Sequence, residues 1–145
     1  MTEKARLEAP CGIHCGKCLL NQALLNEKLR ENIAQRLNVP PEKATCEGCR
    51  AVVGHCPAIG EQCATFVCVQ EKGVEFCCDC SEFPCIKLMP CSDRAETIPH
   101  NMKVYSLALR KHKGEKAWNE MIDQIYSLYF RGQMKIGRGP VPREK

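Results

Sequence analysis

The sequence predicts a small, mainly α-helical domain with irregular cysteine-rich loops and little β-structure, in which metal ions replace much of the hydrophobic core. Three observations predict this fold class. Thirteen of the 145 residues are cysteine, and all of them lie between Cys11 and Cys91. Three C-x-x-C pairs fall within this block, and such pairs are typical of metal sites. Helical periodicity precedes and follows the block but does not continue through it.

The first predicted element is an amphipathic helix over residues 17–38. Its apolar face consists of Leu20, Leu24, Ile33 and Leu37. We expect residues 39–41, Val-Pro-Pro, to end it, because proline lacks an N–H donor and disfavours a helical residue before it. The first cysteine cluster, which consists of Cys11, Cys15 and Cys18, then lies in the loop that enters the helix. The helix dipole there favours thiolates.

Residues 42–93 show no sustained periodicity, and glycines and prolines interrupt them at short intervals. We expect loops, tight turns and one or two short strands here. Residues 72–77 are the best candidate for a turn that leads into a strand. An irregular segment of this length is unusual in an ordinary domain, but it is expected where metal ions form the core.

Two helices follow, over residues 101–113 and 115–131, with Gly114 and Gly132 as their C-terminal ends. The apolar face of the first is Met102, Tyr105, Ala108 and Leu109. The second has a longer stripe, which we expect to pack against the first helix of the chain: Trp118, Met121, Ile122, Ile125, Tyr126 and Tyr129. Residues 133–145 have the composition of a basic flexible tail. We therefore predict one domain over residues 1–132, with the metal block at about 11–91 and the helical part at 92–132.

Disulfide bonds are the alternative explanation for so many cysteines. The N-terminal residues contain no apolar run of the kind that acts as a secretory signal, and no stretch has the apolar length of a membrane span. We therefore expect a cytoplasmic protein that does not enter the membrane. In a reducing cytoplasm, clustered cysteines are more often metal ligands than disulfides.

The net charge of +4 is unevenly distributed. Residues 1–99 carry a net charge of −2, whereas residues 100–145 carry +6. The basic part could offset the charge of ionised thiols or face an acidic partner. No mixture of basic and stacking aromatic residues indicates nucleic-acid binding, so we expect a protein or redox partner, which the sequence does not identify. It also leaves the oligomeric state open.

Structural zinc is one chemistry that the spacing supports. Such a site needs four soft ligands, usually from two C-x-x-C pairs. Cys46 and Cys49 form one suitable pair, and Cys77 and Cys80 form the other, with Cys85 as a substitute. The chain has enough thiols for two or more zinc ions.

An iron–sulfur centre is the second chemistry that the cysteine spacing supports. Cys11, Cys15 and Cys18 place three thiols within eight residues, which suits three corners of a 4Fe–4S cluster. Proline next to Cys56 and next to Cys85 is also common around the fourth ligand of such clusters. Ligand spacing alone leaves zinc and iron–sulfur chemistry open.

Catalytic chemistry has little support. The spacing of Cys11, Cys15 and Cys18 also equals that of radical S-adenosylmethionine enzymes, but the strand–helix alternation of their barrel is absent. His14 and His55 lie beside cysteines, and each is better explained as a loop residue than as a ligand. No catalytic triad, phosphate loop or pair of carboxylates is present, so we name no catalytic residue and favour a protein that is not an enzyme.

Three ordered motifs resemble a known family. They are Cys11-Gly-Ile-His-Cys15-Gly-Lys-Cys18, then Cys46-Glu-Gly-Cys49-Arg50, then the segment from Lys72 to Cys85 that contains Cys77-x-x-Cys80 and Phe83-Pro84-Cys85. Together they resemble the cysteine-rich prokaryotic family called domain of unknown function 3795 over roughly residues 8–90. Gly114-Glu-Lys-Ala-Trp118 is similar to the C-terminal feature of that family.

The resemblance implies a small cytoplasmic protein that is presumed to bind metal and has no established activity. The ligands that it implies are Cys11, Cys15, Cys18, Cys46, Cys49, Cys63, Cys68, Cys77, Cys80 and Cys85. Cys56, Cys78 and Cys91 lie outside its pattern. We thus expect a metal-binding protein whose cysteine-ligated structural zinc ions support an interaction surface. The alternative is an iron–sulfur protein, with a 4Fe–4S cluster, in electron transfer or in metal or cluster handling.

Overall fold

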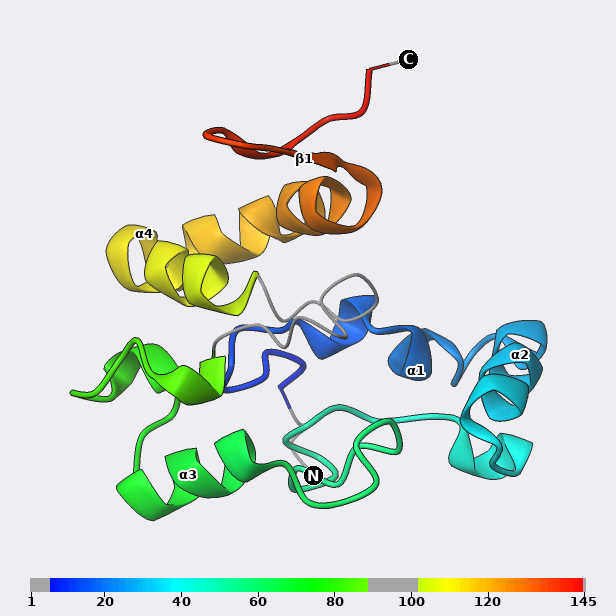
Figure 1. Ribbon diagram of the computed structural model, residues 1–145. Coiled ribbons are helices and arrows are strands. Elements are labelled where there is room, and N and C mark those ends of the chain that lie inside the picture. Colours follow the sequence, from blue (N-terminus) through cyan, green and yellow to red (C-terminus); the bar gives the residue numbers. More distant parts are fainter. Residues whose placement is uncertain (1–5, 89–101, 145) are drawn as a thin grey trace. The chain divides into compact units, whose positions relative to one another are not determined.

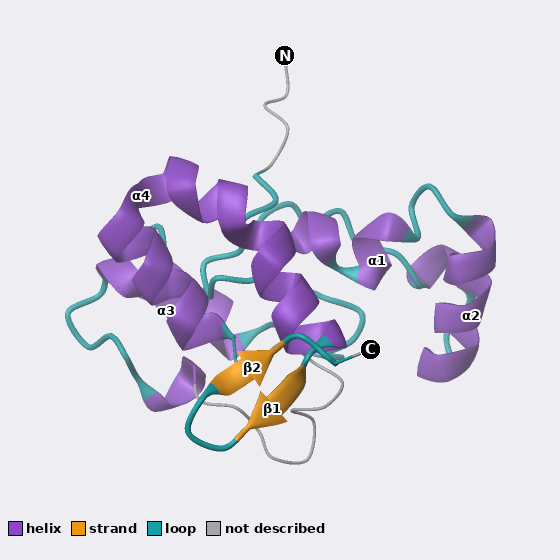
Figure 2. Ribbon diagram, turned by 90° about the horizontal axis from the view of Figure 1, so that it is seen from above, coloured by secondary structure: helices purple, strands orange, loops and turns teal. Residues whose placement is uncertain are grey.

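The computed structural model describes residues 6–88 and 102–144 (Figure 1). The chain divides into two compact units, here called unit 1 (residues 1–76) and unit 2 (residues 77–145). Helices predominate in both, and strands are confined to one short hairpin in the described residues, as the sequence predicts (Figure 2). The single domain expected over residues 1–132 stays a prediction.

Unit 1 consists of short helices joined by loops. Its elements are η1 (Cys15–Lys17), α1 (Leu19–Gln22), α2 (Glu27–Leu37), η2 (Pro41–Lys43) and α3 (Ala64–Lys72). Its larger buried apolar side chains are few, and they are Leu20, Phe66, Val69 and Phe76. Cysteine thiols share the interior with them, since Cys11, Cys15 and Cys46 are also buried.

The single helix predicted over residues 17–38 is wrong, because the chain breaks between α1 and α2. Asn26 has an extended backbone and caps α2, its side chain accepting a hydrogen bond from the N–H of Leu29 at 3.0 Å. The predicted apolar face is split as a result. Leu24 of that face is 40% exposed, and the adjacent Leu25 is 98% exposed. α2 ends at Leu37, just before the prolines as predicted, and Asn38 closes it in the left-handed region at φ 53°.

The strand expected over residues 72–77 is also wrong, since a helix precedes these residues and bends follow it. α3 ends at Lys72, and Gly73 caps it with φ 63°. The helix buries only Phe66 and Val69. Two buried positions in nine residues are too few to produce a clear period in the sequence.

Unit 2 begins with two short turns, η3 (Cys77–Asp79) and η4 (Ile86–Leu88). The long helix α4 (Lys103–Tyr126) follows, continues as a π-helical turn over Ser127–Arg131, and stops at Gly132 as predicted. Gly114 is not helical, with φ 85° and ψ 165°, so the predicted break between two helices is confirmed. Among the described residues, no helix combines the length and the apolar character that crossing a membrane requires.

The last residues form a small hairpin where the sequence predicts a flexible tail. Strands β1 (Gln133–Lys135) and β2 (Gly139–Val141) pair in antiparallel fashion (Figure 2). The Nζ of Lys135 lies 2.9 Å from a carboxylate oxygen of Glu144, beyond the second strand.

The core of unit 2 forms around Trp118, whose Nε1 donates a hydrogen bond to the buried Oγ of Ser106 at 2.9 Å. Ile122 and Ile125 of the predicted stripe are also buried. Met121, Tyr126 and Tyr129 of the same stripe are only half-buried. The predicted face of the preceding segment is partly wrong, because Ser106 and Leu107 are buried while Tyr105 is exposed. A buried serine that satisfies an indole N–H is polar, so a hydrophobic pattern does not reveal it.

Gly54 lies so close to α3 that a side chain does not fit there. It is buried and has φ 79°, and a Cβ added there would lie 2.8 Å from the Cβ of Phe66 on α3. Its N–H donates to the carbonyl of Cys49 at 2.9 Å, and its own carbonyl accepts from the N–H of Cys63 at 2.9 Å. This residue therefore joins the cysteine-rich loop to the start of α3.

Replacing Gly54 with alanine should destabilise unit 1 far more than the same change at Gly60. Gly60 has a similar φ of 77° but nothing within 4 Å of an added Cβ, so Gly60→Ala costs only the backbone strain, about 1 kcal/mol. Gly54→Ala adds a steric conflict and should cost about 3 kcal/mol. Denaturant unfolding of both variants measures the difference, and equal losses would contradict the close approach.

Candidate metal centre

Three segments of unit 1 bring cysteines together through backbone hydrogen bonds. The N–H of Cys15 donates to the carbonyl of Leu7 at 2.6 Å, which places the first cluster against the N-terminal segment. The N–H of Cys46 donates to the carbonyl of Leu20 at 3.0 Å, so the second cluster, which begins with Cys46 and Cys49, lies beside α1. The two clusters meet directly where the N–H of Cys49 donates to the Sγ of Cys15 at 3.3 Å.

Four thiols form a mutually interacting group, the cysteine quartet, which consists of Cys15, Cys18, Cys46 and Cys56. Each of the four interacts with the other three, through a hydrogen bond between Cys46 and Cys56 and through charge in the remaining pairs. Cys15 and Cys46 are buried, and Cys18 and Cys56 are half-buried. The quartet therefore combines thiols from three separate stretches of sequence.

Hydrogen bonds between thiols divide the group into donors and acceptors. The Cys49 thiol donates to Cys15, and with the Cys49 backbone N–H it lowers the pKa of Cys15 to about 7. The Cys56 thiol donates to Cys46 and, helped by the N–H of Gly48, lowers the pKa of Cys46 to about 7. The same contacts raise the pKa of Cys49 and of Cys56, the two donors. Cys15 and Cys46 are therefore about half ionised near pH 7, and each is paired with a protonated thiol.

The pKa of Cys18 is raised, in contrast to those of Cys15 and Cys46, mainly because burial removes its thiol from water. A thiol that resists ionisation in the metal-free protein still becomes a thiolate ligand when a metal ion replaces its proton. The quartet therefore contains both ionised and protonated sulfur donors.

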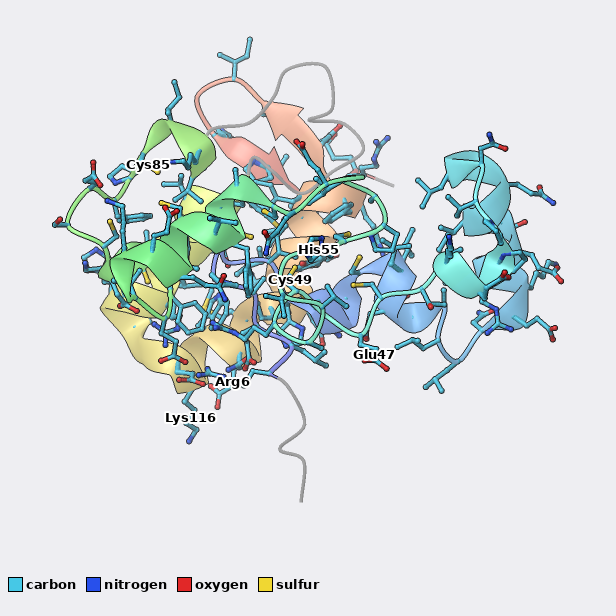
Figure 3. The ribbon with its side chains drawn as sticks, turned by 90° about the horizontal axis from the view of Figure 1, so that it is seen from below. Arg6, Glu47, Cys49, His55, Cys85 and Lys116 are labelled. Atoms are coloured by element: carbon cyan, nitrogen blue, oxygen red, sulfur yellow. The ribbon has the colours of Figure 1, made fainter. Side chains whose placement is uncertain are left out.

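Arg50 follows Cys49 directly and connects the cysteine loop to both ends of unit 1. Its Nε donates to the carbonyl of Glu8 at 2.8 Å, and its Nη2 donates to the carbonyl of Glu75 at 2.9 Å. The guanidinium lies 5.0 Å from the centroid of the buried Phe76 ring. The positive charge of Arg50 also contributes to the lowered pKa of Cys15. Figure 3 shows Cys49 within the unit, whereas the exposed side chain of Glu47 lies at its edge.

The predicted ligands outside the quartet fall in several places. Cys11, Cys49 and Cys63 line a small cavity together with Cys56, and Cys63 is the N-cap residue of α3. Cys68 is half-buried on the same helix. Cys77, Cys80 and Cys85 belong to unit 2, where Cys77 is buried and the other two are half-buried.

The cysteines that lay outside the predicted pattern have different surroundings. Cys56 belongs to the quartet, and the only signal for it in the sequence is the proline that follows it. Cys78 is fully buried in unit 2, where its Sγ lies 4.0 Å from an Arg110 nitrogen and where burial raises its pKa. Cys91 lies outside the described residues. His55 is exposed and His14 half-buried.

The donor set suits a soft metal, although the side chains are not arranged around one. In the described residues, no three or more side chains of His, Cys, Asp or Glu form a ready-made metal site. The thiols are instead satisfied by hydrogen bonds to one another and to backbone N–H groups. Thiolates are soft donors that favour zinc and iron–sulfur centres, so these residues fit either group once their thiol protons are replaced.

Comparison with known proteins finds one relationship. The family model described as "Protein of unknown function (DUF3795)" matches residues 7–90, a range that contains all of unit 1 after Arg6 and the start of unit 2. No curated protein and no solved structure matches the chain.

Arg50→Lys should lower the free energy of unfolding of unit 1 by about 2 kcal/mol. Lysine cannot reach the carbonyls of Glu8 and Glu75 together, so one charge-assisted hydrogen bond is lost. Denaturant unfolding provides the measurement. Arg36→Lys, on the exposed side of α2, is the matched control and should change little. Equal effects of the two changes would refute the role of Arg50.

The stability of the metal-free, reduced protein should rise between about pH 7 and pH 9. Cys15 and Cys46 have a pKa of about 7 in the folded state and an ordinary value of 9.0, so the unfolded state binds more protons in this range. Stability is lost as the pH falls through 7. Above 9 it falls again, because the raised pKa values of Cys49 and Cys56 oppose their ionisation. Unfolding at a series of pH values tests this, and Cys49→Ala should flatten the rise.

Proposed function

The chain belongs to the family described as "Protein of unknown function (DUF3795)", and from its own residues we propose that it is a metal-binding protein in which cysteine-ligated zinc supports an interaction surface. The cysteine quartet carries this proposal. Four thiols that interact pairwise match the ligand number of a closed, tetrahedral structural zinc site. A closed site has no open coordination position, which suits a structural role better than a catalytic one.

The composition of unit 1 supports a structural role for the metal. Few large apolar side chains are buried there, and loops connect its short helices. An ion bound by the quartet would join the segment at Cys15 and Cys18 to the loop that contains Cys46 and Cys56. The free energy of metal binding then becomes part of the free energy of folding.

The surface that this metal would support lies around α1 and α2. Leu19, which follows Cys18 directly, is 54% exposed, and Leu25 between the two helices is almost completely exposed. Leu24, the residue before Leu25, is 40% exposed, and contiguous exposed apolar residues are typical of protein contact sites. The partner proposed for this surface is a protein.

An iron–sulfur protein in electron transfer or cluster handling is the second candidate. The number of thiols favours it, because Cys11 and Cys49 interact with each other close to the quartet and supply more sulfur than one zinc ion needs. Three thiols within residues 11–18 and a fourth from a distant segment satisfy the requirement of a 4Fe–4S cluster.

Elemental analysis and a visible spectrum of protein purified without oxygen should distinguish the two. We expect zinc without visible absorption. Iron and sulfide in equal amounts, with a broad visible band, would instead establish the cluster and refute zinc.

The cysteine variants test the quartet itself. Cys18→Ser and Cys46→Ser should each reduce the bound metal by at least one equivalent and lower the stability of unit 1. His55→Ala, at an exposed position in the same loop region, is the control and should retain the full metal content. Unchanged metal content in both cysteine variants would show that the quartet is not the site.

A further inference from the structure

A small cavity lies next to the quartet, at the start of α3. Four cysteines line it, namely Cys11, Cys49, Cys56 and Cys63. Its other walls are mainly apolar and include Ile59 and Phe66. The volume of about 20 Å³ is enough for one particle of the size of a water molecule.

We propose that this cavity is a second metal position of unit 1, bound by Cys11, Cys49 and Cys63 and joined to the quartet by Cys56, whose sulfur bridges the two ions. This inference rests on the proposed function, because it adds a second ion beside the one in the quartet. Seven cysteines would then bind two ions, and the shared sulfur gives each ion the four ligands that zinc requires.

The backbone around the cavity holds its cysteines in place. The two hydrogen bonds of Gly54, to the carbonyl of Cys49 and from the N–H of Cys63, fix these two residues on either side of one buried glycine. The third ligand comes from a tight turn, in which the N–H of Ala9 donates to the carbonyl of Ile13 at 2.8 Å and the N–H of Gly12 donates to the carbonyl of Ala9 at 3.1 Å. Cys11 lies in this turn and interacts through its charge with Cys49.

Cys63 reaches the cavity from the start of a helix. It is the N-cap residue of α3, a helix of nine residues, and its side chain makes no capping hydrogen bond.

The size of the cavity selects the kind of metal. A 4Fe–4S cluster contains eight heavy atoms and needs much more room than one water-sized particle, whereas a single zinc ion lies only about 2.3 Å from each sulfur. When the ions bind, each thiol releases its proton to solvent. The hydrogen bond between Cys15 and Cys49 is then replaced by bonds from each sulfur to its own ion.

Cadmium-113 NMR of the full-length chain can test the shared sulfur. Metal-free, reduced protein is loaded with cadmium-113, which takes the place of zinc in thiolate sites. We expect two signals that are coupled to each other through the bridging sulfur of Cys56. A cadmium ion bound elsewhere, for example by the cysteines of unit 2, would add a signal without this coupling.

Variants separate the second position from the first. Cys63→Ser and Cys11→Ser should each lose one cadmium equivalent and the coupling, while the signal of the quartet remains. Ala64→Ser places the same hydroxyl at the next, exposed residue and should bind as the wild type does. Circular dichroism identifies any variant that fails to fold, and the other variant then decides.

The two proposals fail in different ways. Uncoupled signals in the wild type, or a full cadmium content in folded Cys63→Ser and Cys11→Ser, would overturn the second position and leave the quartet intact. Wild-type protein that binds neither cadmium nor zinc would overturn the metal-binding function as well.

Discussion

The organisation of unit 1 depends on Arg50. Its guanidinium donates to carbonyl groups at Glu8 and Glu75, which lie near the two ends of the unit, and it covers the ring of Phe76. Arg6 adds to this closure, because it forms an ion pair with Glu75 and also lies over the Phe76 ring. Because Arg50 immediately follows Cys49, the same contacts also fix where the thiols of the loop lie. One cation thereby links chain closure to the placement of the sulfur donors, and its charge favours the thiolate of Cys15.

The two cysteines of the pair Cys46-x-x-Cys49 have different surroundings: one belongs to the quartet and the other lines the cavity beside it. Cys46 interacts with the quartet, whereas Cys49 lines the cavity and donates to Cys15. The usual interpretation of such a pair assigns both cysteines to one ion. The turn at Gly48, with φ 115°, and the contact of Cys49 with the first cluster separate them here. Spacing therefore predicts a metal-binding pair, whereas the surrounding loop determines which thiols each cysteine of the pair contacts.

Local chemistry explains which parts of the fold were predictable. The breaks at Gly114 and Gly132 and the end of α2 before Pro40 follow from glycine and proline, which act through their own backbones. The break at Asn26 was missed because a leucine-rich stripe continues across it, and α3 was missed because it buries only two side chains. The membership of Cys56 in the quartet depends on a long-range contact with Cys46, and the burial of Ser106 depends on Trp118. Contacts between distant residues leave no period or spacing in the sequence.

The contact between Cys15 and Cys49, 34 residues apart, has a further chemical consequence. A thiolate beside a protonated thiol is also the starting arrangement for a disulfide, which forms when an oxidant removes two electrons and the thiol loses its proton. Cys46 and Cys56 form a second pair of the same kind. Oxygen and the proposed metal would therefore compete for the same sulfur atoms. Oxidation of the metal-free protein to these two disulfides would remove the thiols that the proposed metal site needs.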